Sequence, residues 1–283
     1  MQNYNNKNRR TDFNKQNQGN KQNQRYQQDS IKCYPHDTAE LLKAEGNKNI
    51  SLKFHKFVEL VNKKIEKKVL KENMVSPQFN YDLELPNLDK IELIVETSPK
   101  MIIGLGSESV YETSLTLHHV YSVPYIPGSA LKGSFRSFII RKFFENYEKK
   151  ALKDDNFRSI FGGGELTEEE KIDFDSEKGN IIFFDSFPEG LVMIGGDILT
   201  PHFNDYYQHQ EAPTDTKNPD PIPFLSVKGQ FKVVIGIKEN CKEILFGKPK
   251  KDFLKEQLKD MLTNYGVGGK TAVGYGYFKI ISN

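Results

Sequence analysis

The chain has 283 residues, of which 40 are Lys or Arg and 38 are Asp or Glu, so its formal charge is +2. Residues 1–30 hold six basic and two acidic residues, which leaves 34 basic and 36 acidic residues and a charge of −2 for the remainder. This balance excludes a uniformly basic polyanion-binding protein, so any contact with nucleic acid must come from local patches.

The first 89 residues are predicted to lie outside the main domain. Fifteen of residues 1–30 are Asn or Gln, and such a segment buries too little apolar surface to offset its ordering entropy, so we predict a disordered tail. Residues 31–89 are assigned to a helical extension, because apolar residues recur at helical spacing over residues 50–72. There is no apolar signal core and no run of roughly 18 apolar residues, so we expect a cytoplasmic protein with no membrane partner.

Residues 90–283 are predicted to form one domain of alternating strands and helices. A helix with Ser129 as its N-cap is expected to bury Leu131, Phe135 and Ile139, and a second helix is expected to end at Gly266. Strands are predicted at residues 91–103, 180–185, 191–199, 231–237 and 273–281, with an acidic loop at 165–178 and a long loop at 202–223. This order favours an α+β, ferredoxin-like fold.

The strongest local signal is the glycine-rich segment 266–276, GVGGKTAVGYG. It contains Gly-Lys-Thr, but Asn264 stands where a phosphate loop requires its first glycine, and the segment follows a helix and precedes a strand. Both features argue against an NTPase. Five glycines would let backbone N–H groups approach a sugar-phosphate chain, to which Lys270 adds charge. We favour this contact surface over a turn that merely needs positive φ.

Acidic residues are absent from three stretches, 113–144, 221–238 and 261–283, each of which carries basic residues. The chain has only six Arg against 34 Lys, and Arg136 and Arg141 both fall in the first of these stretches. For these arginines, we give equal weight to two roles, which are contact with phosphate and an ordinary position on the surface. Four tyrosines of the acid-free stretches are candidates for base stacking, although packing is their commoner role: Tyr121, Tyr125, Tyr275 and Tyr277.

Catalytic and metal-binding patterns are weak. His118 and His119 would be general acid or base candidates for RNA cleavage, but neighbours on a strand point to opposite faces and make a poor pair. His202, Asp205 and His209 lack a zinc-ligand spacing, and two cysteines cannot build a four-ligand cluster. We therefore predict no catalytic residue, no metal and no cofactor.

Two motifs give a resemblance to a known family. Residues 125–136, YIPGSALKGSFR, resemble the I-P-G-S-S-L-K-G-x-x-R segment of CRISPR RAMP proteins. The segment 266–276 is similar to their C-terminal G-x-G-x-K-T-x-x-G-[YF]-G motif. Residues 200–225, with their Pro-His, Tyr-Tyr and Pro-Thr-Asp pairs, resemble the sixth-subunit family of type III-B Cmr effector complexes. The resemblance covers residues 90–281.

The resemblance implies a noncatalytic RNA-binding subunit with an RRM-like, ferredoxin-like RAMP fold that carries inserted loops or a β-hairpin. Its implied partners are the crRNA, the target RNA, and backbone and terminal RAMP subunits of a Cmr complex. Its implied role in antiviral, RNA-guided interference is to hold the 3′ part of the crRNA and the guide–target duplex. RNA contacts are expected at Ser129, Lys132, Arg136, Arg141, Gly268, Gly269, Lys270, Thr271 and Tyr275.

An alternative within the same family is a RAMP endoribonuclease that cleaves guide or target RNA. In Cmr complexes, target cleavage belongs to backbone subunits and uses an aspartate between the first strand and the first helix. The corresponding stretch here, residues 106–123, contains Glu108 and Glu112 but no Asp. This departure favours the noncatalytic role.

Overall fold

The computed structural model describes residues 50–55, 60–61, 64–65, 73–77, 84–85, 87–109, 113–163, 177–200 and 221–282. The chain divides into two compact units, Met1–Lys68 and Val69–Asn283. The predicted tail, residues 1–30, lies outside the described residues, and the predicted domain boundaries stay a prediction.

The first unit does not continue the helix that the sequence predicts. Helix α3 (Ile50–His55) is followed by two short antiparallel strands, β1 (Leu60–Val61) and β2 (Lys64–Ile65). The predicted helix over residues 50–72 is therefore wrong at 60–61 and 64–65. Val61 and Ile65 are β-branched, a residue type that is favoured in strands.

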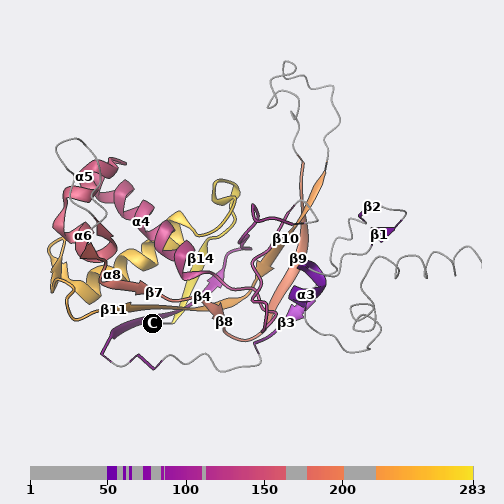
Figure 1. Ribbon diagram of the computed structural model, residues 1–283, viewed down its shortest axis with the longest axis horizontal. Helices are drawn as coiled ribbons and strands as arrows, with labels where there is room; N and C mark the ends of the chain where they lie inside the picture. Colours follow the sequence, from indigo (N-terminus) through magenta and orange to yellow (C-terminus); the bar gives the residue numbers. More distant parts are fainter. Residues whose placement is uncertain are drawn as a thin grey trace, which may run out of the picture. The chain divides into compact units, whose positions relative to one another are not determined.

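The second unit is built on a five-stranded antiparallel sheet, in which the short strand β8 (Phe187–Pro188) pairs with one end of β11. Its four main strands are β4 (Asp89–Thr97), β7 (Ile181–Phe183), β11 (Gln230–Ile237) and β14 (Phe278–Ser282). They lie in the order β14-β4-β11-β7 (Figure 1). Leu93 pairs with Val233 and Val95 with Phe231, and all four side chains are fully buried. The predicted alternation is thus confirmed for β4, whereas β11 is buried on both faces from Val233 to Ile237.

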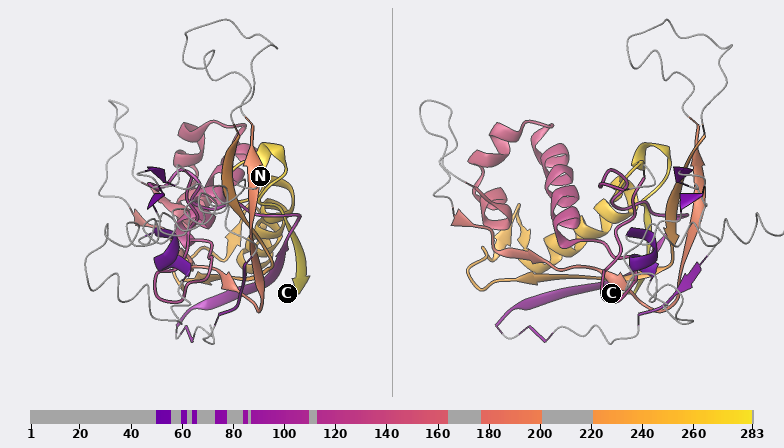
Figure 2. Two further views of the ribbon diagram at one scale, coloured as in Figure 1. Left: turned by 90° about the vertical axis from the view of Figure 1, so that its right-hand side faces the viewer. Right: turned by 45° about the vertical axis from the view of Figure 1, so that its right-hand side comes forward.

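Two main helices cover one face of this sheet (Figures 1 and 2). They are α4 (Gly128–Phe144) and α8 (Lys250–Asp260), and α8 continues as a π-helical turn, Met261–Tyr265, that ends at Gly266. The predicted apolar face of α4 is confirmed, since Leu131, Phe135 and Ile139 are fully buried. The Phe135 ring lies 5.8 Å from that of Phe161 and 5.7 Å from that of Phe183.

A second sheet combines a hairpin inserted between β7 and β11 in the sequence with a strand that precedes β4. It consists of β3 (Asn73–Val75), β9 (Val192–Leu199) and β10 (Ile222–Lys228), in the order β10-β9-β3. Figure 1 shows the β9–β10 hairpin at the end of this unit opposite α5 and α6. The long loop predicted at 202–223 is wrong at 222–223, which begin β10. Residues 202–220 of it and residues 165–176 of the predicted acidic loop lie outside the described residues. The acidic-loop prediction is wrong at 177–178, which form the short strand β6 (Glu177–Lys178).

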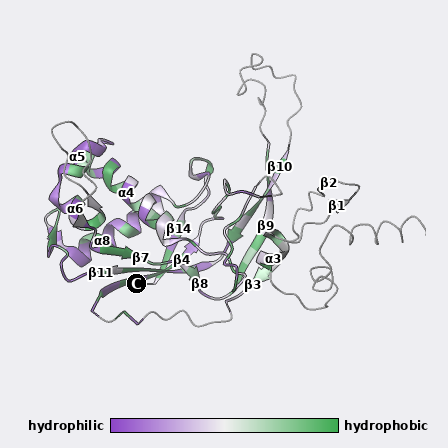
Figure 3. Cartoon of the chain, viewed as in Figure 1, coloured by the Kyte–Doolittle hydropathy of each residue, from purple (hydrophilic) through white to green (hydrophobic). Residues whose placement is uncertain are grey.

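The remaining elements are short. They are α5 (Glu148–Lys153), α6 (Asp155–Phe161), β5 (Gly162–Gly163), β6 (Glu177–Lys178), β8 (Phe187–Pro188), β12 (Ile244–Leu245), β13 (Lys248–Pro249) and the 3₁₀ turn η2 (Thr271–Val273). Apolar residues dominate β7, β9 and β10, whereas α8 mixes both kinds (Figure 3). None of the helices in the described part of the chain is long and apolar enough to cross a membrane.

Three predicted strands are clearly shorter than expected, and the one predicted at 180–185 spans only Ile181–Phe183. The first ends at Thr97, and of residues 101–103 only Met101 forms a bridge, with Val227. The last begins at Phe278 instead of 273, because Gly274 and Gly276 take positive φ values of 97° and 77°. A strand cannot run through such residues, although their neighbours are apolar or aromatic.

Removing the Phe135 ring should destabilise the protein, because the ring fills the space between α4, α6 and β7. We expect Phe135→Ala to lower the free energy of unfolding by about 3–5 kcal/mol in urea denaturation. Gly133→Ala on the same helix should raise it by about 0.5–1 kcal/mol, since the added Cβ meets nothing within 4 Å. Equal effects of the two changes would contradict this packing.

Candidate nucleic-acid interface

The N-terminus of α4 borders an open pocket of about 470 Å³. Three segments supply its walls: the first turn of α4, the turn after α6, and the β6–β7 segment. Among the described residues, its lining includes two lysines and no acidic residue. The lining residues are Gly128, Ser129, Lys132, Phe161, Gly162, Gly163, Lys178, Gly179, Ile181, Ile182 and Phe183.

Two glycines allow the walls of this pocket to approach each other. A Cβ on Gly128 would lie 2.2 Å from the carbonyl oxygen of Phe183, and one on Gly179 would lie 2.5 Å from the carbonyl carbon of Phe161. Both contacts are too short for any side chain. The glycine of the Pro-Gly-Ser motif is therefore required for α4 to pack closely against β7.

The helix start is held by a carboxylate that the sequence did not reveal. The N–H of Gly128 donates to Oδ1 of Asp185 at 2.8 Å. The prediction that Ser129 caps the helix is wrong, because Pro127 occupies the N-cap position and no side chain caps there. Asp185 instead supplies the acceptor and the negative charge that a helix N-terminus favours. A phosphate would therefore contact the pocket beside Ser129 and Lys132, not at this N–H.

The two arginines of α4 are held by the protein itself. Arg136 forms an ion pair with Glu148 at 2.6 Å, and its guanidinium lies 5.3 Å from the centre of the Phe157 ring. The Arg141 guanidinium lies 5.9 Å from the Tyr265 ring centre. Neither arginine lines the pocket. The structure therefore separates Arg136 and Arg141 from Ser129 and Lys132.

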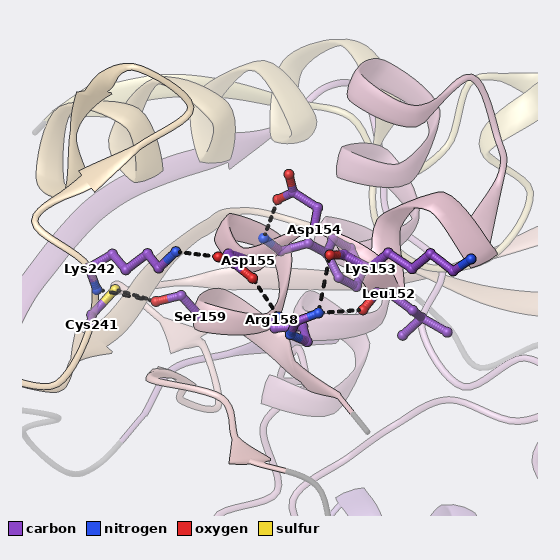
Figure 4. Close-up of polar contacts among 9 residues, drawn as sticks. Leu152, Lys153, Asp154, Asp155, Arg158, Ser159, Cys241 and Lys242 are labelled. Carbon is purple, nitrogen blue, oxygen red and sulfur yellow. Dashed lines mark hydrogen bonds and ion pairs between the residues drawn. The ribbon is translucent and has the colours of Figure 1, made fainter. Parts of the chain in front are cut away.

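The third arginine of the main domain, Arg158, also has an intramolecular role (Figure 4). It donates to the carbonyl oxygens of Leu152 at 3.3 Å and Lys153 at 3.1 Å, and it pairs with Asp155. It thereby satisfies carbonyls at the end of α5. Asp154 caps α6 by accepting the N–H of Phe157 at 2.9 Å. These contacts, which sequence patterns missed, fix the α5–α6 corner beside the pocket.

The glycine-rich segment 266–276 packs on residues 100–103. The N–H of Gly269 donates to the carbonyl of Ile102 at 2.8 Å, and that of Gly276 donates to the carbonyl of Lys100 at 2.9 Å. A Cβ on Gly268 would lie 2.2 Å from the Ile102 oxygen. These two N–H groups are therefore used within the protein, and the glycine at 268 is needed for close approach of protein backbone.

Lys270 and Thr271 lie on the outer part of this loop. Lys270 adopts a left-handed conformation with φ of 57°, and Thr271 begins η2. Both side chains are half-buried, and neither residue lines the pocket at α4. The loop is nevertheless joined to α4 through the preceding π-helical turn, because the hydroxyls of Tyr265 and Ser137 lie 2.7 Å apart.

Tyr275 joins the glycine-rich loop to the inserted hairpin. Its hydroxyl donates to Oδ2 of Asp197 in β9 at 2.7 Å, and Lys100 approaches the same oxygen at 3.4 Å. Burial, followed by the hydrogen bond to Asp197, raises the pKa of Tyr275 to about 12. Its ring meets Phe224 of β10 at 5.9 Å. This side chain therefore ties two segments together, a role that its position in the motif did not indicate.

The candidate catalytic residues do not form a recognisable acid–base centre. His118 lies in a turn, so the expectation that a strand would separate it from His119 is wrong, and their rings stack at 5.1 Å. Burial and the neighbouring His119 lower the pKa of His118, although Asp185 acts in the opposite direction. Within the described ranges, no three His, Cys, Asp or Glu side chains are placed to hold a metal. His202, Asp205 and His209 lie outside those ranges.

Comparison with known proteins places this architecture in a family. The model of the RAMP superfamily matches residues 94–279. The CRISPR system Cmr subunit Cmr6 of Pyrococcus furiosus is 30% identical over 281 residues, which cover 80% of each chain. Cmr6 of Saccharolobus solfataricus is 25% identical over 67% of this chain and 57% of its own.

A solved structure shares the fold. A chain in the cryo-EM structure of the type III-B Cmr-beta bound to cognate target RNA has a TM-score of 0.50 and 22% identity. The match covers 69% of this chain and 60% of that chain. The chain described here belongs to the RAMP superfamily. Within that superfamily it is a type III-B Cmr subunit, and its relatives are Cmr6 proteins.

The Asp197 carboxylate should make folding stability depend on pH. Burial alone raises its pKa, but the hydrogen bonds from Tyr275 and the Ile198 N–H, together with Lys100, hold the pKa below its ordinary value. A depressed folded-state pKa stabilises the protein above the unfolded pKa, and this stabilisation is lost as pH falls through the folded value. Urea titrations between about pH 6 and 2.5 should show that the free energy of unfolding falls more steeply with decreasing pH for the wild type than for Asp197→Asn. If the two proteins lose stability in parallel, Asp197 is not the source of this pH dependence.

Proposed function

We propose that this chain is a noncatalytic RNA-binding subunit of a type III-B Cmr effector complex. The observation that carries this proposal is the pocket at the start of α4, whose described lining includes two lysines, glycine backbone and apolar residues, with no carboxylate among the residues that the structure describes. Such a site suits a sugar-phosphate backbone, because contacts to phosphates are largely independent of base sequence. The pocket is also built from the Pro-Gly-Ser-x-x-Lys motif that carries the resemblance to RAMP proteins.

The fold is one that supports RNA binding, and we propose that it is ferredoxin-like. The four main strands of the sheet lie in the order β14-β4-β11-β7, with α4 between β4 and β7 in the chain and α8 between β11 and β14. Numbered by their place in the chain, these strands run 4-1-3-2, with two helices on one face. This βαββαβ connectivity is that of the split βαβ motif.

The proposed partners are the crRNA, the target RNA, and the backbone and terminal RAMP subunits of the complex. A chain of similar fold belongs to a Cmr-beta assembly bound to cognate target RNA, and the relatives with recognisable sequence similarity are Cmr subunits. The subunit would hold the 3′ part of the crRNA and the guide–target duplex during antiviral interference in the cytoplasm. Base pairing would then read the target, while the protein reads the backbone.

Two regions are proposed to divide the RNA contacts. Ser129 and Lys132, with Lys178 opposite, would contact phosphates in the pocket. The outer face of the glycine-rich loop, with Lys270 and Thr271, would provide a second contact. The proposed contributions of Arg136, Arg141, Gly268, Gly269 and Tyr275 are indirect, because these residues order α4 or the glycine-rich loop. The β9–β10 hairpin would be the inserted hairpin that approaches the duplex.

Removing the pocket lysines should weaken RNA binding without regard to sequence. We expect Lys132→Ala with Lys178→Ala to lower the affinity for unrelated single-stranded RNAs alike. The slope of log K against log salt should decrease by roughly 0.7 for each phosphate that the variant no longer neutralises. Fluorescence anisotropy at several salt concentrations measures both effects.

Lys255→Ala is the matched control, because Lys255 is a half-buried lysine of α8 that does not line the pocket. It should leave affinity and salt slope unchanged. Lys270→Ala tests the glycine-rich loop separately. Should the double variant bind like the wild type while Lys270→Ala loses affinity, the RNA is bound at the loop and not at the pocket. If neither change matters, the proposed interface is wrong.

The proposal also predicts that the purified protein leaves RNA intact. Labelled guide and target RNA, alone and annealed, should show no specific cuts after incubation with and without Mg²⁺. The RAMP endoribonuclease remains the alternative, with His118 as the side chain to change. Specific cuts that vanish in His118→Ala would replace the noncatalytic function with that alternative.

A further inference from the structure

Three aromatic rings form a stacked column in the turn that precedes α4. The His118 ring lies in the middle, 5.1 Å from His119 with an interplanar angle of 14° and 4.6 Å from Tyr121 with an angle of 25°. His119 is exposed, and 46% of Tyr121 is exposed. The outer rings of the column therefore face solvent.

The column is held rigidly by its turn. The N–H of His118 donates to the carbonyl of Val123 at 2.9 Å, and the N–H of Ser122 donates to the carbonyl of His118 at 2.7 Å. The buried ring of Phe187 supports His118 edge-on at 5.6 Å. A column ordered in this way loses little entropy when a further ring is added.

The surroundings of the central imidazole disfavour its protonation. Nδ1 of His118 accepts the N–H of Tyr121 at 3.3 Å, and protonation of Nδ1 would remove this acceptor. Burial and His119 also lower the pKa of His118, although Asp185 acts in the opposite direction. The centre of the column therefore suits contact with a flat, uncharged ring better than contact with a phosphate.

The column adjoins the pocket at the start of α4. Ile126, which follows the turn, exchanges two backbone hydrogen bonds with Ser186, of 2.9 and 2.8 Å. The neighbouring carboxylate, Asp185, accepts the N–H of Gly128 and also acts electrostatically on His118. The turn and the first turn of α4 are thus fixed to the same short segment. A strand whose phosphates contact the pocket would present its next bases near the column.

We propose that the His119–His118–Tyr121 column is a stacking site for an unpaired nucleobase of the bound RNA. This proposal rests on the proposed RNA-binding function and adds a base contact to its phosphate contacts. Bases stack on aromatic side chains without regard to their identity, because every base offers a π face. The site would therefore hold one splayed nucleotide of any sequence. Tyr275 does not share this role, since its hydroxyl and ring are engaged by Asp197 and Phe224.

The test uses the full chain and a short single-stranded oligoadenylate in which 2-aminopurine replaces adenine. Stacking quenches 2-aminopurine fluorescence, so binding to the wild type should reduce the signal beyond that of the free RNA. Tyr121→Leu should lose much of this quenching and bind about fivefold more weakly or worse, as expected when one base–aromatic stack is removed. Tyr121→Phe, which keeps the ring, should behave like the wild type.

Tyr147→Leu is the matched control, because Tyr147 is 59% exposed and lies at the far end of α4, where Lys150 packs on its ring at 4.8 Å. It should change neither quenching nor affinity. An abasic oligomer should bind the wild type and Tyr121→Leu equally. If Tyr121→Leu keeps full affinity and quenching, or weakens the abasic oligomer equally, the stacking site is wrong while the RNA-binding function stands. If the wild type binds no RNA, both are wrong.

Discussion

The candidate interface depends on how closely helix α4 is seated against strand β7. A Cβ at Gly128 would lie 2.2 Å from the Phe183 oxygen, and the Gly128 N–H donates to Asp185, two residues beyond Phe183. These contacts fix the distance of the first turn of α4 from β7 and the direction in which the helix leaves the sheet. The pocket, with Lys132 on one wall and Lys178 on another, exists because of that placement. A bulkier residue at 128 would separate the walls and remove the Asp185 contact.

Charge is distributed so that the protein neutralises some of its own cations and leaves others at the interface. Arg136 is paired with Glu148 and lies over Phe157, and Lys142 is paired with Asp260. The pocket lysines lie where none of the described lining residues is acidic. A nearly neutral protein can thus present a local positive surface to a polyanion. Asp185 already interacts with the positive end of the α4 dipole. The charges of Lys132 and Lys178 would therefore be the main source of electrostatic attraction between the pocket and an anion.

The glycine-rich loop and the inserted hairpin are joined by one polar contact, between Tyr275 and Asp197. Lys100, in the segment on which the loop packs, approaches the same carboxylate. This arrangement connects the C-terminal motif to the second sheet through half-buried groups, whose hydrogen bonds offset the cost of burial. The proposed contacts at the loop and the hairpin would therefore be positioned together.

The sequence by itself determined the alternating faces of β4, the buried stripe of α4 and the family motifs, because periodicity and glycine requirements are local properties of the chain. It did not determine where α4 begins or that Asp185 binds there, since residues 128 and 185 are 57 positions apart and meet only when β7 is paired. The roles of Arg136 and Tyr275 were equally hidden. Their partners, Glu148 and Asp197, are ordinary acids in the sequence, and only tertiary packing brings each one within hydrogen-bonding distance.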